Sequence, residues 1–338
     1  MPAFVNRLRA NAPDSFLAAL LVAAALAGFL VVDQVHWWQL KAEYAFGWLV
    51  PVFVGYVLLE RWPRFTAAFR GAGPDPLGRG WRAALAVMAA IAMTFGALAF
   101  LLGALYRAGA GVSQPGSLAL ALGFSGLLLG MVYFNTPIGV VGADPVPGGW
   151  RALRRDARLR VTMLFLFPAL IWMLSAPLVD AIENQLSLFL LRKVTIVVAT
   201  VFNTLGYPVV QQGNVLVLPL GEVQVAEACS GIRSLTACLF AGAFLAAVFL
   251  DRLWKKLTLF GLAAALAFLT NLLRSLFLTG WAYAHGSQSI EGSVHDLTGY
   301  AVLGLTCVGL LSLLPLFRSD TWLRWFAPRG ETPAQPPG

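Results

Sequence analysis

The segment that decides the fold class reads AALAVMAAIAMTFGALAFLLGALY, from Ala83 to Tyr106. It contains no charged residue, and a helix of this length, rising about 1.5 Å per residue, crosses the roughly 30 Å hydrocarbon core of a bilayer. The 338-residue chain as a whole is 59% hydrophobic and 12% charged, with a mean hydropathy of +0.74. A water-soluble domain could not bury so much apolar surface in one core. We therefore predict an all-α, polytopic membrane bundle surrounded by membrane lipids.

Apolar runs of about 18 residues or more predict eight transmembrane helices. They lie near residues 16–33, 44–59, 83–106, 117–142, 161–179, 230–250, 257–280 and 297–316. The first run follows Arg7 and Arg9, as in a signal peptide, but its length favours an uncleaved span. A shorter apolar stretch at 194–207 leads through Pro208 into a polar–apolar alternation over 215–225. We expect this segment before the sixth helix to be extracytoplasmic, interfacial or re-entrant.

The positions of the basic residues orient these helices. With eight spans and a cytoplasmic N-terminus, 18 of the 24 Lys and Arg residues lie in inner segments and four lie outside, while Arg233 and Arg274 lie within helices. The positive-inside rule therefore predicts that both termini are cytoplasmic. A ninth span at 194–207 would move the basic cluster at 251–256 outside, which argues against it. Since the net charge of +8 is divided among short loops, no nucleic-acid partner is indicated.

The chain is expected to have three parts. Residues 1–15 form a cytoplasmic N-terminal tail, 16–316 form the transmembrane domain, and 317–338 form a cytoplasmic, Pro-rich tail predicted to be disordered. The candidate chemistry lies in a core at 222–300. No CxxC pair and no HExxH motif occur, and the remaining Cys and His spacings are not those of metal ligands. We expect no metal and no cofactor, and a metalloprotease is disfavoured.

Three reactive side chains are predicted at one depth near the outer face. Cys229 begins the sixth span, Arg274 lies in the seventh roughly 9 Å below its outer end, and His295 begins the eighth. A helix N-terminus and a nearby arginine both favour a thiolate at Cys229. A cysteine nucleophile needs a base or ion-pair partner, which His295 would supply. The three together therefore indicate a catalytic site.

Each of these residues also has a structural interpretation. Arg274 alone is compatible with an interfacial anchor whose side chain reaches the membrane surface. His295 alone is compatible with an interface position, and the Ser293 to Asp296 segment resembles a helix capping box with Ser293 as the cap. Cys238 and Cys307, inside long apolar runs, are interpreted as packing residues.

Arg233 is the fourth residue after Cys229, so both would face one side of a common helix. In that position Arg233 would stabilise a thiolate or hold a substrate carboxylate. It could equally pair with Glu222 or Glu227 for structure alone.

The sequences around these residues resemble the exosortase and archaeosortase family of membrane-embedded cysteine transpeptidases. The resemblance rests on three motifs, which are EACSGIRS from Glu227 to Ser234, NLLR from Asn271 to Arg274, and HDLTG from His295 to Gly299. The order and spacing of the motifs and their eight-span setting are also similar, over about residues 40–316. One departure is Phe46, where many members of the family have histidine, and it leaves any secondary role of that position in question.

The resemblance implies an enzyme, a cysteine protease or transpeptidase. It assigns Cys229 as the nucleophile that forms an acyl-thioester, Arg274 as proton donor or oxyanion partner, and His295 as the third catalytic group. Supporting or substrate-binding roles would fall to Arg233, Glu227 and Asn271. The implied substrates are exported, membrane-anchored proteins with C-terminal sorting signals of the Pro-Glu-Pro (PEP-CTERM) type. The implied setting is the inner membrane of bacteria that export polysaccharide, with the site at the extracytoplasmic face and an unknown acceptor.

A membrane transporter, or a protein that binds an anionic lipid or ligand, is the alternative from another class. In that interpretation Arg233 and Arg274 hold the anion near the outer face, and Cys229 is incidental. The alternative predicts that Cys229 tolerates substitution.

Overall fold

The computed structural model describes residues 12–70, 75–141, 149–224, 231–250, 252–290 and 292–318. Most of these residues are helical. The chain divides into two compact units, one made of Met1–Leu191 and Ile232–Phe240 and the other of Arg192–Gly231 and Ala241–Gly338. The polytopic helical bundle predicted from hydropathy is confirmed. The predicted tails lie largely outside the described residues.

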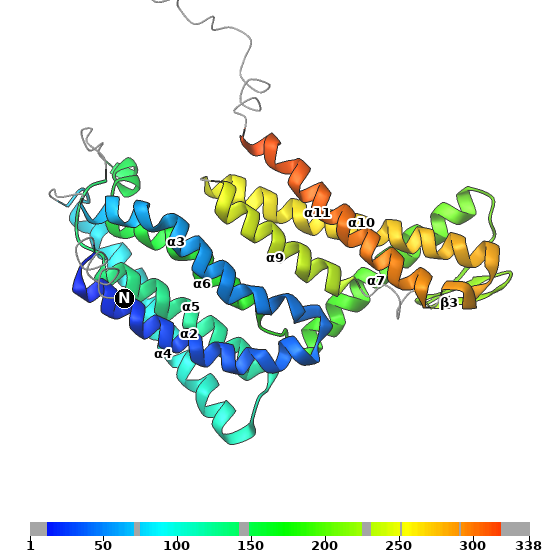
Figure 1. Ribbon diagram of the computed structural model, residues 1–338, viewed down its shortest axis with the longest axis horizontal. Helices are drawn as coiled ribbons and strands as arrows, with labels where there is room; N and C mark the ends of the chain where they lie inside the picture. The colour runs from blue at the N-terminus through cyan, green and yellow to red at the C-terminus, as the bar shows by residue number, and fades with distance from the viewer. Residues whose placement is uncertain are drawn as a thin grey trace, which may run out of the picture. The chain divides into compact units, whose positions relative to one another are not determined.

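The first unit is a bundle of long helices (Figure 1). Its elements are α2 (Asp14–Leu40), η1 (Ala42–Leu49), α3 (Val50–Phe69), α4 (Arg79–Ala110), α5 (Gln114–Asn135), η2 (Gly149–Arg154), α6 (Ala157–Ser175) and the first parts of α7 (Asp180–Thr204) and α9 (Ile232–Phe249). Helix α5 packs against α2, α4 and α6, and α3 packs against α6. More than half of the most apolar part of α5 is buried, whereas α4 is almost wholly exposed. This pattern suits a central α5 and an α4 that faces lipid.

Glycines let α4 and α5 approach closely. A Cβ added at Gly123 of α5 would lie 2.3 Å from the backbone nitrogen of Phe100 in α4, and one at Gly96 would lie 2.5 Å from the backbone nitrogen of Leu127. Lipid is as apolar as leucine, so helices in a bilayer associate through close packing of this kind rather than through hydrophobic burial. The small residues therefore determine how these two helices pair.

Ion pairs in the first unit join segments that the distribution of basic residues predicts to lie on one side of the membrane. Arg107 pairs with Asp33, and Lys41 contacts Asp180 at 3.2 Å and Glu183 at 3.0 Å. These pairs lie at predicted outer ends. Burial alone would lower the pKa of Lys41, but hydrogen bonds to the two carboxylates and their charges outweigh it and raise that pKa above its usual 10.5.

The second unit contains the rest of α7 and α9, a small sheet and a helical hairpin (Figure 1). Its further elements are β1 (Val210–Gln212), β2 (Val215–Leu218), β3 (Gly221–Gln224), α10 (Leu253–His285), η3 (Ser287–Ile290) and α11 (Ser293–Arg318). The Thr306 hydroxyl donates to the Thr270 hydroxyl at 3.1 Å between α10 and α11. Lys255 donates to the carbonyl of Phe317 at 2.6 Å, where α10 begins and α11 ends. These bonds hold the two helices in one register.

The three strands form an antiparallel sheet in the order β1-β2-β3. Leu216 and Leu218 of β2 are buried and their neighbours are half-buried, as the polar–apolar alternation predicted. The sheet contacts the C-terminal end of α10, where a Cβ at Gly221 would lie 2.5 Å from the Ser287 hydroxyl. Since Gly221 has a φ of +132°, only glycine suits this turn sterically.

Nine helices in the described ranges are long and apolar enough to cross a membrane, one more than predicted. The additional helix is α7, whose C-terminal part is the apolar stretch at 194–207. Hydropathy missed its length because Asp180, Glu183, Arg192 and Lys193 interrupt the apolar pattern. Helix α10 also extends beyond the predicted 257–280 at both ends.

In the predicted orientation, both ends of α7 contact segments that lie on the outer side. At its start Asp180 pairs with Lys41, which the charge analysis places outside. Beyond its end the Tyr207 ring packs on that of Tyr283 at 5.3 Å, near the predicted outer end of α10. A helix that joins two outer segments does not cross the bilayer, so in this orientation eight spans and two cytoplasmic termini remain our prediction.

Replacement of Gly123 by alanine tests the close packing of α4 and α5. The added methyl group meets the backbone at Phe100, so the helices must separate, at a cost of about 1–3 kcal/mol. Thermal unfolding in detergent should show a lower melting temperature for Gly123→Ala. The matched control is Gly28→Ala in α2, where no heavy atom lies within 4 Å of the new methyl, and it should melt at or slightly above the wild-type temperature. Equal melting of all three chains would contradict the packing described.

Candidate functional site

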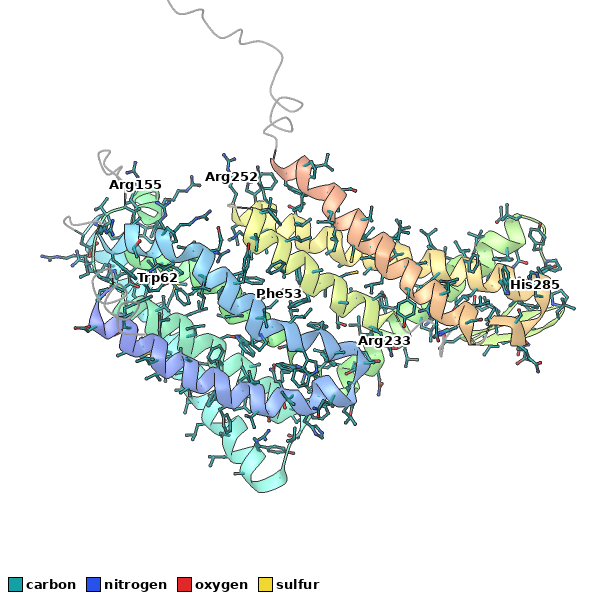
Figure 2. The ribbon with its side chains drawn as sticks, viewed as in Figure 1. Phe53, Trp62, Arg155, Arg233, Arg252 and His285 are labelled. Atoms are coloured by element: carbon teal, nitrogen blue, oxygen red, sulfur yellow. The ribbon has the colours of Figure 1, made fainter. Side chains whose placement is uncertain are left out.

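The hairpin of α10 and α11 brings Arg274 and His295 into contact. Arg274 is half-buried and lies eleven residues before the end of α10, because this helix continues to His285 (Figure 2). That spacing corresponds to roughly 16 Å along the helix axis, deeper than the 9 Å expected from sequence. A guanidinium at this depth needs hydrogen-bond acceptors from the protein. His295 provides them from the first turn of α11.

The Nη2 atom of Arg274 lies 2.9 Å from Nε2 of His295 and donates to the carbonyl of His295 at 3.3 Å. Arginine carries only donors, so Nε2 must be the acceptor in this contact and carries no proton. The ring proton is then on Nδ1, which lies 3.2 Å from Oδ1 of Asp296. This pair of contacts selects the neutral tautomer whose Nε2 can take up a proton.

The surroundings of Arg274 leave part of its hydrogen-bonding capacity unused. Its Nε is buried, and none of the described residues accepts a hydrogen bond from it. A Cβ added at Gly299 would lie 3.6 Å from Nη2 and 3.9 Å from Cζ, so glycine leaves space beside the guanidinium. A buried donor without an acceptor is costly unless it binds another group. The site is thus suited to an anionic or developing oxyanionic group.

Asn271, predicted as a supporting residue, lies one helical turn before Arg274 on the buried side of α10. It is only 5% exposed. Its carbonyl accepts a hydrogen bond from the Ser275 hydroxyl at 3.0 Å. Asn271 is therefore a buried neighbour of Arg274 along α10.

The predicted nucleophile Cys229 and the supporting Glu227 lie outside the described residues. Arg233 is exposed in the first turn of α9 and belongs to the first unit (Figure 2). Helix α9 begins at Ile232, after Gly231 in a left-handed conformation with a φ of +70°. The expectation that Cys229 and Arg233 face one side of a common helix stays a prediction, because Cys229 lies outside the described residues.

The structure does not contain the predicted capping box at the start of α11. Ser293 is the first residue of the helix rather than its cap, and Gly292 accepts the hydrogen bond from the backbone N–H of Asp296 at 3.1 Å. The Asp296 carboxylate instead contacts the imidazole of its neighbour His295. A carboxylate next to a candidate catalytic histidine was the available sequence signal for this contact.

Phe46, the position at which the sequence departs from the resemblance, packs within the first unit. Its ring centroid lies 4.8 Å from that of Phe240 in α9, and Phe53 of α3 stacks on the same ring at 5.3 Å (Figure 2). The Thr236 hydroxyl donates to the carbonyl of Glu43 at 2.8 Å. These contacts hold the start of α9, which contains the last three residues of the EACSGIRS motif, against η1 and α3.

Within the described part of the chain, no three His, Cys, Asp or Glu side chains gather as metal ligands. The side chains that meet at the candidate site are the Arg274 guanidinium, the His295 imidazole and the Asp296 carboxylate.

Comparison with known proteins gives one result. Residues 37–312 match the model of the family described as Transmembrane exosortase. The matched range includes Arg274, His295 and all three motifs. No curated protein and no solved structure matches the chain.

Substitutions at Gly299 test the space beside Arg274. A methyl group at this position makes ordinary contacts, whereas a larger side chain displaces the guanidinium. We expect Gly299→Ala to keep most of the activity and Gly299→Leu to lower it by about tenfold or more, since misplacement of a catalytic group by about 1 Å can cost far more. The measurement is the rate of substrate processing, with melting temperatures as a folding control. Full activity of a folded Gly299→Leu chain would show that the guanidinium position is unimportant.

Proposed function

Because this chain belongs to the transmembrane exosortase family, whose members are membrane transpeptidases acting on C-terminal sorting signals of exported proteins, we propose that it is a thiol-dependent transpeptidase. Cys229 attacks the sorting signal and forms an acyl-thioester. Arg274 and His295 complete the catalytic site. The observation that carries the proposal is the hydrogen bond between these two residues, which leaves a proton-accepting Nε2 on His295.

In the first step the Cys229 thiol gives its proton to Nε2 of His295, and the thiolate attacks the carbonyl carbon of the scissile peptide bond. The C–N bond then breaks, and the leaving amine takes up the proton held by the imidazole. The product is a thioester between Cys229 and the N-terminal part of the substrate. An acceptor nucleophile or water attacks this thioester and restores the thiol. Every step uses side chains of the chain itself, so no cofactor is required.

Arg274 serves best as the hydrogen-bond partner of the oxyanion in this scheme. A guanidinium does not readily give up its proton and is a poor general acid, whereas its fixed N–H groups suit a developing negative charge. Its buried Nε, which no described residue binds, supports this role. Arg274 must release Nε2 of His295 when the thiol proton is transferred, so the two residues would act in sequence.

The substrates in this proposal are exported proteins whose Pro-Glu-Pro sorting tails still anchor them in the membrane. The acidic residue of such a tail would be attracted by arginines such as Arg233. The site would face the extracytoplasmic side of the bacterial inner membrane, where an anchored substrate presents the residues before its apolar segment. Glu227 and Asn271 would support the reacting groups.

Substitution of the three cysteines separates nucleophile from packing residue. We expect Cys229→Ala to accumulate the uncleaved precursor of an anchored reporter with a Pro-Glu-Pro tail. Cys238→Ala and Cys307→Ala are the matched controls, and both should process the reporter. The size shift of the reporter, at equal membrane levels of each variant, is the measurement. Unchanged processing by Cys229→Ala would remove the thiol mechanism and favour anion binding or transport.

A lysine in place of Arg274 keeps the charge but loses the planar group that reaches both Nε2 and the carbonyl of His295. We expect the rate of processing to fall by about 10²–10³, the range typical for loss of an oxyanion-hole donor. Arg252→Lys, at an exposed position just before α10, is the control and should process at the wild-type rate. A wild-type rate for Arg274→Lys would exclude the role given to the guanidinium.

A further inference from the structure

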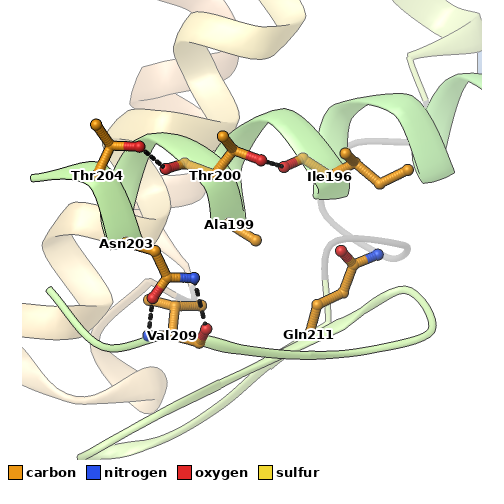
Figure 3. Close-up of a pocket in the computed structure, with 7 residues that line it drawn as sticks. All are labelled: Ile196, Ala199, Thr200, Asn203, Thr204, Val209 and Gln211. Carbon is orange, nitrogen blue, oxygen red and sulfur yellow. Dashed lines mark hydrogen bonds between the residues drawn. The ribbon is translucent and has the colours of Figure 1, made fainter.

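An open cleft of about 520 Å³ lies within the second unit, between the C-terminal half of α7 and strand β1 (Figure 3). Ile196, Thr200 and Asn203 line it from α7, and Val209 and Gln211 line it from the strand side. The opposite side of α7 packs elsewhere, since Val194, Thr195 and Val198 are completely buried. The cleft is therefore formed by a helix face that the core does not use.

Among the strands that the structure describes, β1 pairs with β2 alone and forms an edge of the sheet. Val210 pairs with Val217, Gln211 with Leu216 and Gln212 with Val215, across a two-residue turn. The pair that closes such a turn is hydrogen-bonded, and bonded pairs alternate along an antiparallel ladder. The N–H and C=O of Gln211 therefore point away from β2.

Asn203 shows where this outward edge leads. Its side-chain amide donates to the carbonyl of Val209 at 3.0 Å, and its Oδ1 accepts from the N–H of Val209 at 3.1 Å (Figure 3). An amide that pairs with both backbone groups of one residue imitates a neighbouring strand. Val209 is two residues before Gln211 and so lies in the same outward row. At the edge next to the cleft, the backbone of Val209 thus already binds an amide. The N–H and C=O of Gln211 point in the same direction.

The cleft also has a basic end. Arg192 and Lys193 lie one helical turn before Ile196, and by helical spacing they share the face of α7 that lines the cleft. None of the residues lining the cleft is acidic. Charge complementarity therefore favours a peptide that carries a carboxylate over a neutral or basic one.

We propose that the cleft between α7 and β1 binds an extended, acidic segment of the anchored substrate, which adds to the edge of β1 at Gln211. Main-chain hydrogen bonds of this kind give affinity with little demand on sequence, and the basic end of the cleft selects for the acidic residue. The inference rests on the proposed function, because it assigns the substrate of the same enzyme a docking position. The sheet contacts the C-terminal end of α10, the helix that carries Arg274.

Proline at position 211 tests the edge. Gln211→Pro removes an outward N–H that the β1–β2 ladder does not use, and proline is tolerated on edge strands. We expect KM for the reporter to rise about three- to tenfold, as for loss of one or two hydrogen bonds, with kcat little changed. Gln211→Ala keeps the N–H and should raise KM less. Equal KM values for a folded Gln211→Pro chain and the wild type would overturn the proposal.

A photo-crosslinking amino acid provides a readout that does not depend on turnover. In the full-length Cys229→Ala chain, the probe at position 211 should crosslink to the anchored reporter, and the probe at Val210, on the other face of β1, should not. Crosslinks from position 211 to lipid alone would overturn the proposal. Absence of any crosslink while wild-type chain processes the reporter would also overturn it, leaving the proposed function intact. Continued processing by Cys229→Ala itself would instead reject the proposed function.

Discussion

An arginine inside an apolar helix must find its hydrogen-bond acceptors in the protein, because lipid offers none. In α10 this requirement is met for Nη2 of Arg274 by His295 of α11, which accepts through both its ring and its carbonyl. The contact demands a particular register of the two helices, which the Thr270–Thr306 hydrogen bond and the lack of a side chain at Gly299 support. The need to satisfy one charge thus places Arg274 beside the imidazole of His295.

The same requirement accounts for the polar groups buried in the first unit. Gln34 of α2 donates to the carbonyl of Trp172 at 3.2 Å and accepts from the Ser175 hydroxyl at 2.7 Å, both on α6. The Trp37 indole donates to the Ser117 hydroxyl of α5 at 2.8 Å. Each polar side chain bonds to a different helix, so these bonds fix which helix ends lie at the same level. Apolar packing alone would leave that choice weakly determined.

Sequence patterns predicted the helices well, because a long uncharged run has few other stable forms in a membrane. They also predicted that Arg274 and His295 belong together. The depth of Arg274 was underestimated, because α10 continues through polar residues to His285. The start of α9 at Ile232, after Gly231 in a left-handed conformation, was not predicted either, since the conformation of one glycine is not visible in a periodicity. The role of Gly299 depends on a contact between two helices, which no local pattern contains.

The proposed mechanism depends most directly on a covalent intermediate at Cys229. The decisive measurement is mass spectrometry of the chain after brief reaction with an anchored reporter and acid quenching, with and without hydroxylamine, which cleaves thioesters. We predict a reporter fragment attached to the peptide that contains Cys229, released by hydroxylamine as the hydroxamate. Processing of the reporter with no such adduct, and with no hydroxamate formed, would contradict a thioester at Cys229.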